Sequence, residues 1–203
     1  MGESKAGEMA SAWDRWLQIL LETQSFKSSS TAIYPLASGT LSQFYIDCRR
    51  ALSYPEARQV VGKLIYDRVR SLELDAVGGL LVGAYPIAIA VSDAAYALAG
   101  RVVRAFVIRK EPKQHGLKKL IEGDVIRGQR VLIVDDVITS GGSTVEAIEK
   151  SRQEGLEVIK AIALIDRQEQ KGRENIEKQG VPFEALCTLD DLRNFKAPSR
   201  LAI

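Results

Sequence analysis

Residues 131–144 read VLIVDDVITSGGST, an apolar run followed by small polar residues. Asp135 and Asp136 interrupt an apolar run, and the small polar residues 139–144 follow at once. A strand that ends in carboxylates and a glycine-rich loop is typical of the edge of an α/β sheet, where ligands bind. Five of the first seven residues are apolar and indicate a buried strand: Val131, Leu132, Ile133, Val134 and Val137.

The composition is that of a soluble globular protein of ordinary domain size. The chain has 203 residues, 46% of them hydrophobic and 27% charged, with a net charge of only +2. Its apolar stretches end well short of the roughly 18 residues that a membrane span needs. Cys48 and Cys187 form no CxxC pair, which favours free thiols in a reducing compartment. We expect a cytoplasmic protein without membrane or nucleic-acid partners, and a flexible leader over residues 1–8.

Hydrophobic periodicity predicts alternating strands and helices, and therefore a mainly parallel central sheet flanked by helices. An amphipathic helix is expected over residues 9–24, followed by a hairpin of residues 32–36 and 43–47 that lies outside the main sheet. A capping box at Ser53 and Glu56 predicts the start of the next helix. Further strands are expected at 76–82, 102–108, 130–135, 158–165 and 183–187, helices at 86–98, 143–154 and 171–179, and a long loop at 109–124.

The loop after the acidic pair has the properties of an anion site. It leads into a helix whose N-terminus, with its free N–H groups and dipole, favours a phosphate, and Ser143 and Glu146 have capping-box spacing. Gly141 and Gly142 allow close backbone approach. Two carboxylates beside this loop suit ribose hydroxyls or a hydrated Mg²⁺. The spacing matches neither a Walker A loop nor GxGxxG, and an ordinary strand–turn–helix corner is the alternative.

Residues 109–123, RKEPKQHGLKKLIEG, form a second candidate site. Five cations and the single histidine of the chain, His115, lie in this segment. Such a loop suits a polyphosphate, since it can screen the charge of a leaving group, and a histidine can donate the proton. A solvated loop is the alternative, whereas a nucleic-acid patch is disfavoured because the loop lacks aromatic residues. The cations are Arg109, Lys110, Lys113, Lys118 and Lys119.

Residues 131–144 resemble the motif of type I phosphoribosyltransferases that binds 5-phosphoribosyl 1-pyrophosphate (PRPP). The resemblance implies that Asp135 and Asp136 face the ribose hydroxyls and that the loop holds the 5′-phosphate. It also implies Mg²⁺ carried by PRPP, with no dedicated set of protein ligands. The PRPP-binding residues expected in this stretch are Asp135, Asp136, Val137, Ile138, Thr139, Ser140, Gly141, Gly142 and Ser143.

Residues 109–116 resemble the catalytic loop of the orotate phosphoribosyltransferases. The signature Arg-Lys-x-x-Lys-x-His-Gly falls on Arg109, Lys110, Lys113, His115 and Gly116. The resemblance implies that the first four of these bind PRPP. It also implies that Lys113, His115, Asp135 and Asp136 are catalytic. Because the family's loop reaches a neighbouring subunit, a homodimer is expected.

Two further segments are similar to the orotate-binding parts of that family. Asp166-Arg167-Gln168-Glu169 follows a predicted strand. The resemblance implies that Arg167 binds the orotate carboxylate, and a guanidinium can donate two parallel hydrogen bonds to such a group. SGTLSQFYIDCR, residues 38–49, resembles the segment that flanks the base, with Tyr45 and Ile46 as contacts, and Thr139 is also expected there. A surface arginine and ordinary hairpin packing are the alternatives.

The sequence departs from the family pattern at three places. Ala37 stands where many orotate enzymes have a lysine that contacts PRPP and orotate, and Tyr85 replaces a small or acidic residue. Leu117 and Lys118 follow His115-Gly116 in place of the more usual Thr-Gly or Thr-Lys. The missing lysine favours an alternative, a phosphoribosyltransferase for another base. A non-catalytic PRPP- or nucleotide-sensing protein on the same fold is a second alternative.

The resemblance therefore implies a type I phosphoribosyltransferase fold and the transfer of a phosphoribosyl group from PRPP to orotate. The products would be orotidine 5′-phosphate and pyrophosphate, in the de novo synthesis of UMP. We expect one domain over residues 9–203, with a small hood at about 9–50, built from the N-terminal hairpin region, and a PRPP-binding core at about 55–195. The sequence pattern of residues 38–49 most resembles that of the orotate domain of bifunctional UMP synthases. This resemblance implies a fused or paired orotidine 5′-phosphate decarboxylase.

Overall fold

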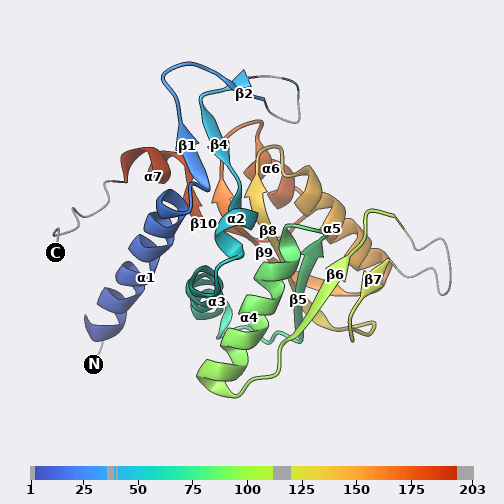
Figure 1. The fold of residues 1–203 in the computed structure, drawn as a ribbon. Helices are drawn as coiled ribbons and strands as arrows, with labels where there is room; N and C mark the ends of the chain where they lie inside the picture. The colour runs from blue at the N-terminus through green and yellow to red at the C-terminus, as the bar shows by residue number, and fades with distance from the viewer. Residues whose placement is uncertain (1–2, 36–38, 40, 112–119, 196–203) are drawn as a thin grey trace.

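The computed structural model describes residues 3–35, 39, 41–111 and 120–195, with only the backbone of residues 3–11. Within these ranges a six-stranded sheet has the order β10-β9-β8-β5-β6-β7 (Figure 1). Its strands are parallel apart from β7, which pairs antiparallel with β6. The expected mainly parallel sheet is confirmed. The strands are β5 (Ala76–Leu80), β6 (Arg104–Ile108), β7 (Ile121–Glu122), β8 (Arg130–Ile138), β9 (Glu157–Asp166) and β10 (Phe183–Thr188).

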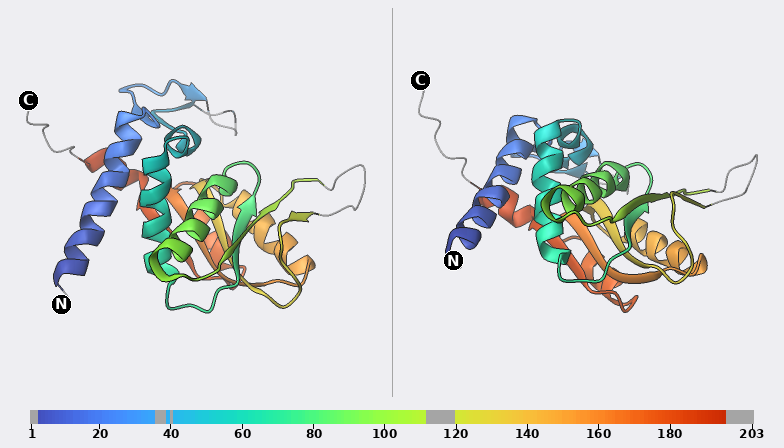
Figure 2. Two further views of the ribbon diagram at one scale, coloured as in Figure 1. Left: turned by 60° about the horizontal axis from the view of Figure 1, so that its bottom comes forward. Right: turned by 90° about the horizontal axis from the view of Figure 1, so that it is seen from below.

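Helices cover both faces of the sheet, which buries the apolar side chains of each face (Figure 2). The helices α3 and α4 lie on one face and α5 and α6 on the other. A Cβ at Gly62 would lie 2.3 Å from the Ala90 carbonyl oxygen, so glycine allows α3 and α4 to approach closely. These helices are α3 (Pro55–Val69), α4 (Ala84–Ala99), α5 (Gly142–Gln153) and α6 (Gly172–Glu177), and the short α7 (Leu189–Asn194) follows β10.

The strand β8 shows how one continuous apolar run serves two hydrophobic cores. Leu132 and Val134 pack in the core with α3 and α4, whereas Val131 and Ile133 pack in the core with α5 and α6. Successive side chains of a strand point to opposite faces, so a strand buried on both faces needs no polar alternation. The acidic pair continues this alternation and is thereby divided between the two faces.

The N-terminal region forms two small sheets that lie outside the main one, as predicted (Figure 1). The predicted pairing was wrong: β2 (Tyr34–Pro35) pairs with β3 (Leu41–Ser42), whereas β4 (Phe44–Ile46), in the second predicted strand, pairs with the unpredicted β1 (Phe26–Ser28). α1 (Glu3–Glu22) begins about six residues before the predicted helix, and α2 (Cys48–Leu52) was not predicted. The Trp13 indole donates to the Leu186 carbonyl at 2.8 Å and so fastens α1 to β10.

Three local predictions were wrong. The strand β8 does not end at the acidic pair but continues to Ile138, because β9 pairs with it over that whole length. Neither capping box forms: α3 is preceded by Tyr54, and α5 by Gly141 in the left-handed conformation, with no side-chain cap in either case. The predicted loop 109–124 contains β7, since Ile121 pairs with Ile108 and is buried.

Candidate active site

The candidate site lies where β8 runs past its neighbour β5. The pairing of β5 with β8 ends at Ile133, whereas the pairing of β8 with β9 continues to Ile138. The acidic pair therefore lies beyond the last residues of β8 that pair with β5, at an edge of the kind where open α/β sheets bind ligands. Asp135 and Asp136 follow the alternation of the strand and lie in different surroundings.

Asp135 is buried, with only 7% of its surface exposed. The Thr144 hydroxyl of α5 donates to Asp135 Oδ2 at 2.8 Å, and the Asp136 N–H donates to Oδ1 at 3.0 Å. Burial, and next the negative charge of Asp136, raise the pKa of Asp135 to about 7, and the Thr144 hydrogen bond opposes this rise. Asp135 thus ties β8 to the first turn of α5.

Asp136 is half-buried and lies on the opposite side, against the start of α4. A Cβ at Gly83 would lie 2.7 Å from Asp136 Cγ and Oδ1, so glycine at this position leaves room for the carboxylate against the backbone. The Val137 N–H donates to Asp136 Oδ1 at 2.9 Å. Of the two carboxylates, Asp136 is the one with more of its surface accessible to a ligand.

The loop between β8 and α5 is held in shape by glycines and by α6. Gly141 has a φ of +74°, and a Cβ there would lie 2.7 Å from the Gly172 carbonyl oxygen. The side-chain amide of Asn175 donates to the Ser140 carbonyl at 3.0 Å. Gly142 and Ser143 are exposed and begin α5, whose first N–H groups have no acceptor within the helix. These features form a pocket edge suited to an anion.

Arg167 lies next to this loop, directly after β9, because its backbone N–H donates to the Ile138 carbonyl at 3.0 Å. Its side chain is 5% exposed. Nε and Nη2 donate to the two carboxylate oxygens of Glu169, at 3.0 and 3.2 Å, and Nη2 also donates to the Ser42 hydroxyl at 3.1 Å. Arg167, which the sequence predicted to bind the orotate carboxylate, is therefore already paired with the carboxylate of Glu169.

Tyr45 and Ile46 lie on β4, in the small sheets above the main one. The Tyr45 ring is 38% exposed, with its centroid 5.7 Å from that of Tyr34. Ile46 is half-buried and packs against the main core. Ser42, which precedes them on β3, connects this region to Arg167. Tyr45 therefore offers an accessible ring, whereas Ile46 also has the ordinary packing role that was the alternative.

The described part of the basic segment is fixed to α5. Lys150 Nζ donates to the Arg109 carbonyl at 2.9 Å and to the Lys110 carbonyl, and it pairs with Glu146 at 2.7 Å. The Arg109 guanidinium pairs with Glu122 on β7 at 3.0 Å, while Lys110 is exposed. The predicted Lys113, His115, Gly116, Leu117, Lys118 and Lys119, and the departure at Ala37, lie outside the described residues.

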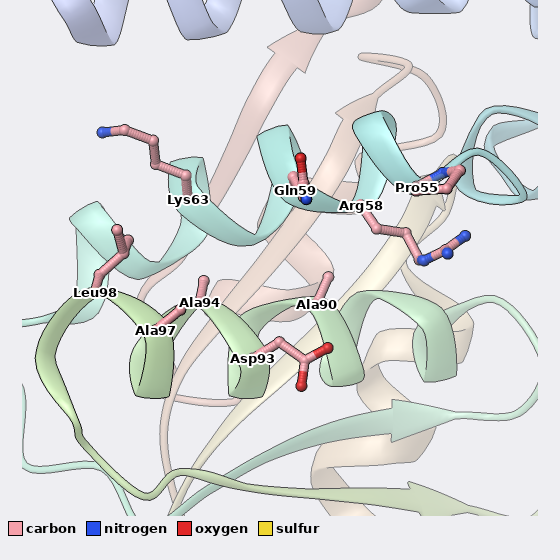
Figure 3. A pocket seen from close by; sticks show the side chains of 9 residues that line it. All are labelled: Pro55, Arg58, Gln59, Lys63, Ala90, Asp93, Ala94, Ala97 and Leu98. Carbon is pink, nitrogen blue, oxygen red and sulfur yellow. The ribbon is translucent and has the colours of Figure 1, made fainter.

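A groove of about 490 Å³ between α3 and α4 contains none of the predicted site residues (Figure 3). Ala90, Ala94 and Ala97 of α4 line it together with Arg58 of α3. Across the described ranges we find no cluster of three or more potential metal-binding side chains. Within the same ranges, none of the helices has the length and apolarity to cross a bilayer.

Several residues shape the site without having been predicted, and only some of them had a signal in the sequence. Gly83 lies just before one predicted helix and Gly172 within the first turn of another, which is a weak sign of close backbone approach. Glu169 lay within the quoted Asp-Arg-Gln-Glu motif but had no assigned role. Lys150 had no signal, because its contacts are 40 and 41 residues away in the chain.

The fold and the site together define a phosphoribosyltransferase of type I. Residues 51–185 match the model of the phosphoribosyl transferase domain. An orotate phosphoribosyltransferase of Aquifex aeolicus is 41% identical over 173 residues, which cover 85% of this chain and 93% of that protein. The chain belongs to the orotate phosphoribosyltransferase family.

Two solved structures agree with this assignment. An orotate phosphoribosyltransferase of Mycobacterium tuberculosis H37Rv in complex with PRPP has a TM-score of 0.68 and 31% identity, covering 88% of this chain and 91% of that one. The UMP synthase of Leishmania donovani has a TM-score of 0.72 and 32% identity. The match covers 88% of this chain and 37% of the UMP synthase. The type I phosphoribosyltransferase fold expected from the sequence is confirmed.

Proposed function

We propose that this protein transfers the phosphoribosyl group of PRPP to orotate, giving orotidine 5′-phosphate and pyrophosphate in the synthesis of UMP. One observation carries the proposal beyond the family match. The Arg167 N–H bonds to Ile138, which directly precedes the anion-binding loop. A residue whose cation suits a planar carboxylate therefore follows a strand directly beside the start of a loop that suits a phosphate.

Each part of the product has a proposed partner among the described residues. The 5′-phosphate binds the N–H groups at the start of α5 and the hydroxyls of Thr139, Ser140 and Ser143. Asp136 faces the ribose hydroxyls, because its carboxylate is the more exposed of the pair. Asp135 acts through Thr144 to position the loop. Val137, Ile138, Gly141 and Gly142 contribute backbone, and Tyr45, Ile46, Thr139 and Arg167 contact the orotate.

The reaction breaks the bond between the ribose anomeric carbon and the pyrophosphate oxygen, and forms a bond from that carbon to the orotate ring nitrogen, which releases its proton to solvent. Catalysis by this chain consists mainly of placement and of stabilising the departing charge. Arg109, Lys110, Lys113 and His115 screen the leaving pyrophosphate. His115 donates a proton to it at a near-neutral pH. Mg²⁺ enters as part of the PRPP substrate, held by the oxygens of that substrate.

The proposal is tested by following orotate consumption with PRPP and Mg²⁺, and by comparing the native chain with Lys113→Ala. We expect turnover that falls about 10²- to 10³-fold in the variant, as for the removal of a group that stabilises transition-state charge. Glu174→Gln, on the exposed face of α6, is the control and retains full activity. Binding of PRPP without turnover of any base would instead identify a sensor.

Phosphoribosyl transfer to another base is a second candidate, because Ala37 lacks the cation that the orotate enzymes commonly have there. The same assay with uracil and other bases, read as pyrophosphate release, distinguishes the two. Release with another base but not with orotate would exclude the main proposal.

We further propose that the active protein is a cytoplasmic homodimer that shares its basic loop between subunits. Two buried free cysteines are consistent with a reducing compartment. A fused or paired orotidine 5′-phosphate decarboxylase is also proposed, since the similar Leishmania chain is a UMP synthase. Mixing Lys113→Ala with Asp136→Asn subunits tests the shared loop, because hybrid dimers regain activity only if residues from both subunits complete one site.

A further inference from the structure

The side chain of Arg167 is an unusual carboxylate site, because one whole edge of its guanidinium is occupied from within the chain. Nε and Nη2 form the edge that pairs best with a carboxylate in two parallel hydrogen bonds. Glu169 takes both positions, at 3.0 and 3.2 Å. Arg167 is 5% exposed and Glu169 33% exposed, so an incoming anion meets the glutamate before the arginine.

The segment that carries Glu169 is strained. Gln168, Gln170 and Lys171 have φ values of +57°, +49° and +57°, a conformation that costs a non-glycine residue free energy. The Gln168 N–H is held by Asp166 Oδ1 at 2.8 Å, and Glu169 is held by Arg167. A strained segment persists only while the surrounding contacts hold it.

We propose that Glu169 is an internal competitor for the carboxylate subsite, and that a substrate carboxylate binds by taking its place on Arg167. This inference rests on the proposed function. Two carboxylates on one guanidinium edge would repel each other, so the ligand and Glu169 exclude one another. The ligand's affinity is therefore reduced by the fraction of molecules in which Glu169 is already bound.

The competition concerns a base that carries a carboxylate. A planar ring with a carboxylate takes both hydrogen bonds that Glu169 gives up, whereas an uncharged ring has no carboxylate to form that pair. The Ser42 hydroxyl remains on Nη2 and keeps the guanidinium in place when the glutamate leaves. Glu169 therefore weakens the binding of a carboxylate ligand in particular, and its removal should increase the preference for the anionic base.

The test compares the native chain with Glu169→Gln, which keeps the size of the side chain and removes its charge. We expect the KM for orotate, and its Kd by titration calorimetry, to fall about three- to tenfold, while the KM for PRPP stays unchanged. The activity with uracil, which has no carboxylate to place on Arg167, stays unchanged and therefore falls relative to the activity with orotate. Glu174→Gln removes the same charge nearby, outside the Arg167 contacts, and leaves all four quantities as in the native chain.

An unchanged or higher orotate KM in Glu169→Gln would overturn the inference and would mean that Glu169 positions Arg167 for the substrate. If the native chain neither binds nor consumes orotate, the proposed function fails, and the inference fails with it. Turnover in the native chain without tighter binding in the variant counts against the inference alone.

Discussion

Two corners of the sheet, β8–α5 and β9–α6, have the same architecture but opposite local chemistry. Each joins a parallel strand to a helix at the candidate site. The first turns on a glycine, Gly141, and leads into a helix of 12 residues. The second turns on three non-glycine residues with positive φ and leads into a helix of six residues. The first corner thus exposes backbone N–H donors at little conformational cost. The second has a strained backbone, and its cation, Arg167, is paired with Glu169 of the same segment.

The largest expected effect comes from filling the first corner with a methyl group. In Gly141→Ala the Cβ would lie 2.7 Å from the Gly172 carbonyl oxygen, and the backbone conformation would be strained as well. We expect the KM for PRPP to rise and kcat/KM to fall by more than about 10²-fold, because a small misplacement in a reacting site has that consequence.

Gly180→Ala is the matched control, since Gly180 has a φ of +70° and nothing within 4 Å of the added Cβ. It should lower the thermal midpoint slightly and leave the KM for PRPP unchanged. Equal loss of activity in both variants would show that strain alone, and not the contact with Gly172, controls the corner.

The second effect in size is expected from Asp136→Asn, which removes the accessible charge of the pair. A charge-assisted hydrogen bond contributes about 1.5–3 kcal/mol, so kcat/KM should fall roughly 10- to 100-fold. Asp124→Asn, at an exposed ion pair with Arg104, should change kcat/KM less than about twofold. A smaller loss in Asp136→Asn than in Asp135→Asn would reverse the roles assigned to the two carboxylates.

The third effect is a pH dependence of stability. Because the pKa of Asp135 is raised to about 7, the folded state keeps a proton that the unfolded state releases near pH 4. Asp135 therefore contributes stability that is fully present below about pH 4 and is lost as the pH rises through about 7. Urea unfolding should show this loss, at most about 4 kcal/mol, in the native chain.

Asp135→Asn removes the titrating group and should flatten that part of the pH profile, while Asp124→Asn follows the native chain. An identical profile in native and Asp135→Asn proteins would mean that the carboxyl titrates at an ordinary pH in spite of its burial.

The smallest effect is expected at the second corner. Lys171→Gly should relieve the strain of a φ of +57°, which offsets the greater chain entropy of glycine and leaves a net gain of about 0.5 kcal/mol. The thermal midpoint should rise by about 1–2 °C. Lys178→Gly, at a position with a φ of −60°, should lower it instead. A drop in Lys171→Gly would show that the lysine side chain, and not the backbone, governs this corner.

The contrast between the corners also marks what the sequence could predict. The apolar run of β8 and the glycines after it predicted a sheet edge with an anion site, because both signals are local. The burial of Asp135 was not predictable, since it depends on where β5 stops pairing with β8. The contact of Arg167 with Ser42 joins residues 125 positions apart. The capping box at Ser143 failed because Gly141, left-handed and pressed against Gly172, sets the start of α5.

The helix α5 sets the distance between its own N-terminus and the backbone that Lys150 binds. The helix begins at the anion site with Gly142, and eight residues later Lys150 holds the carbonyls of Arg109 and Lys110. At the rise of an α-helix this separation is about 12 Å. The Arg109 and Lys110 backbone is therefore held at a fixed distance from the proposed phosphate site. A residue inserted between Gly142 and Lys150 would change that distance.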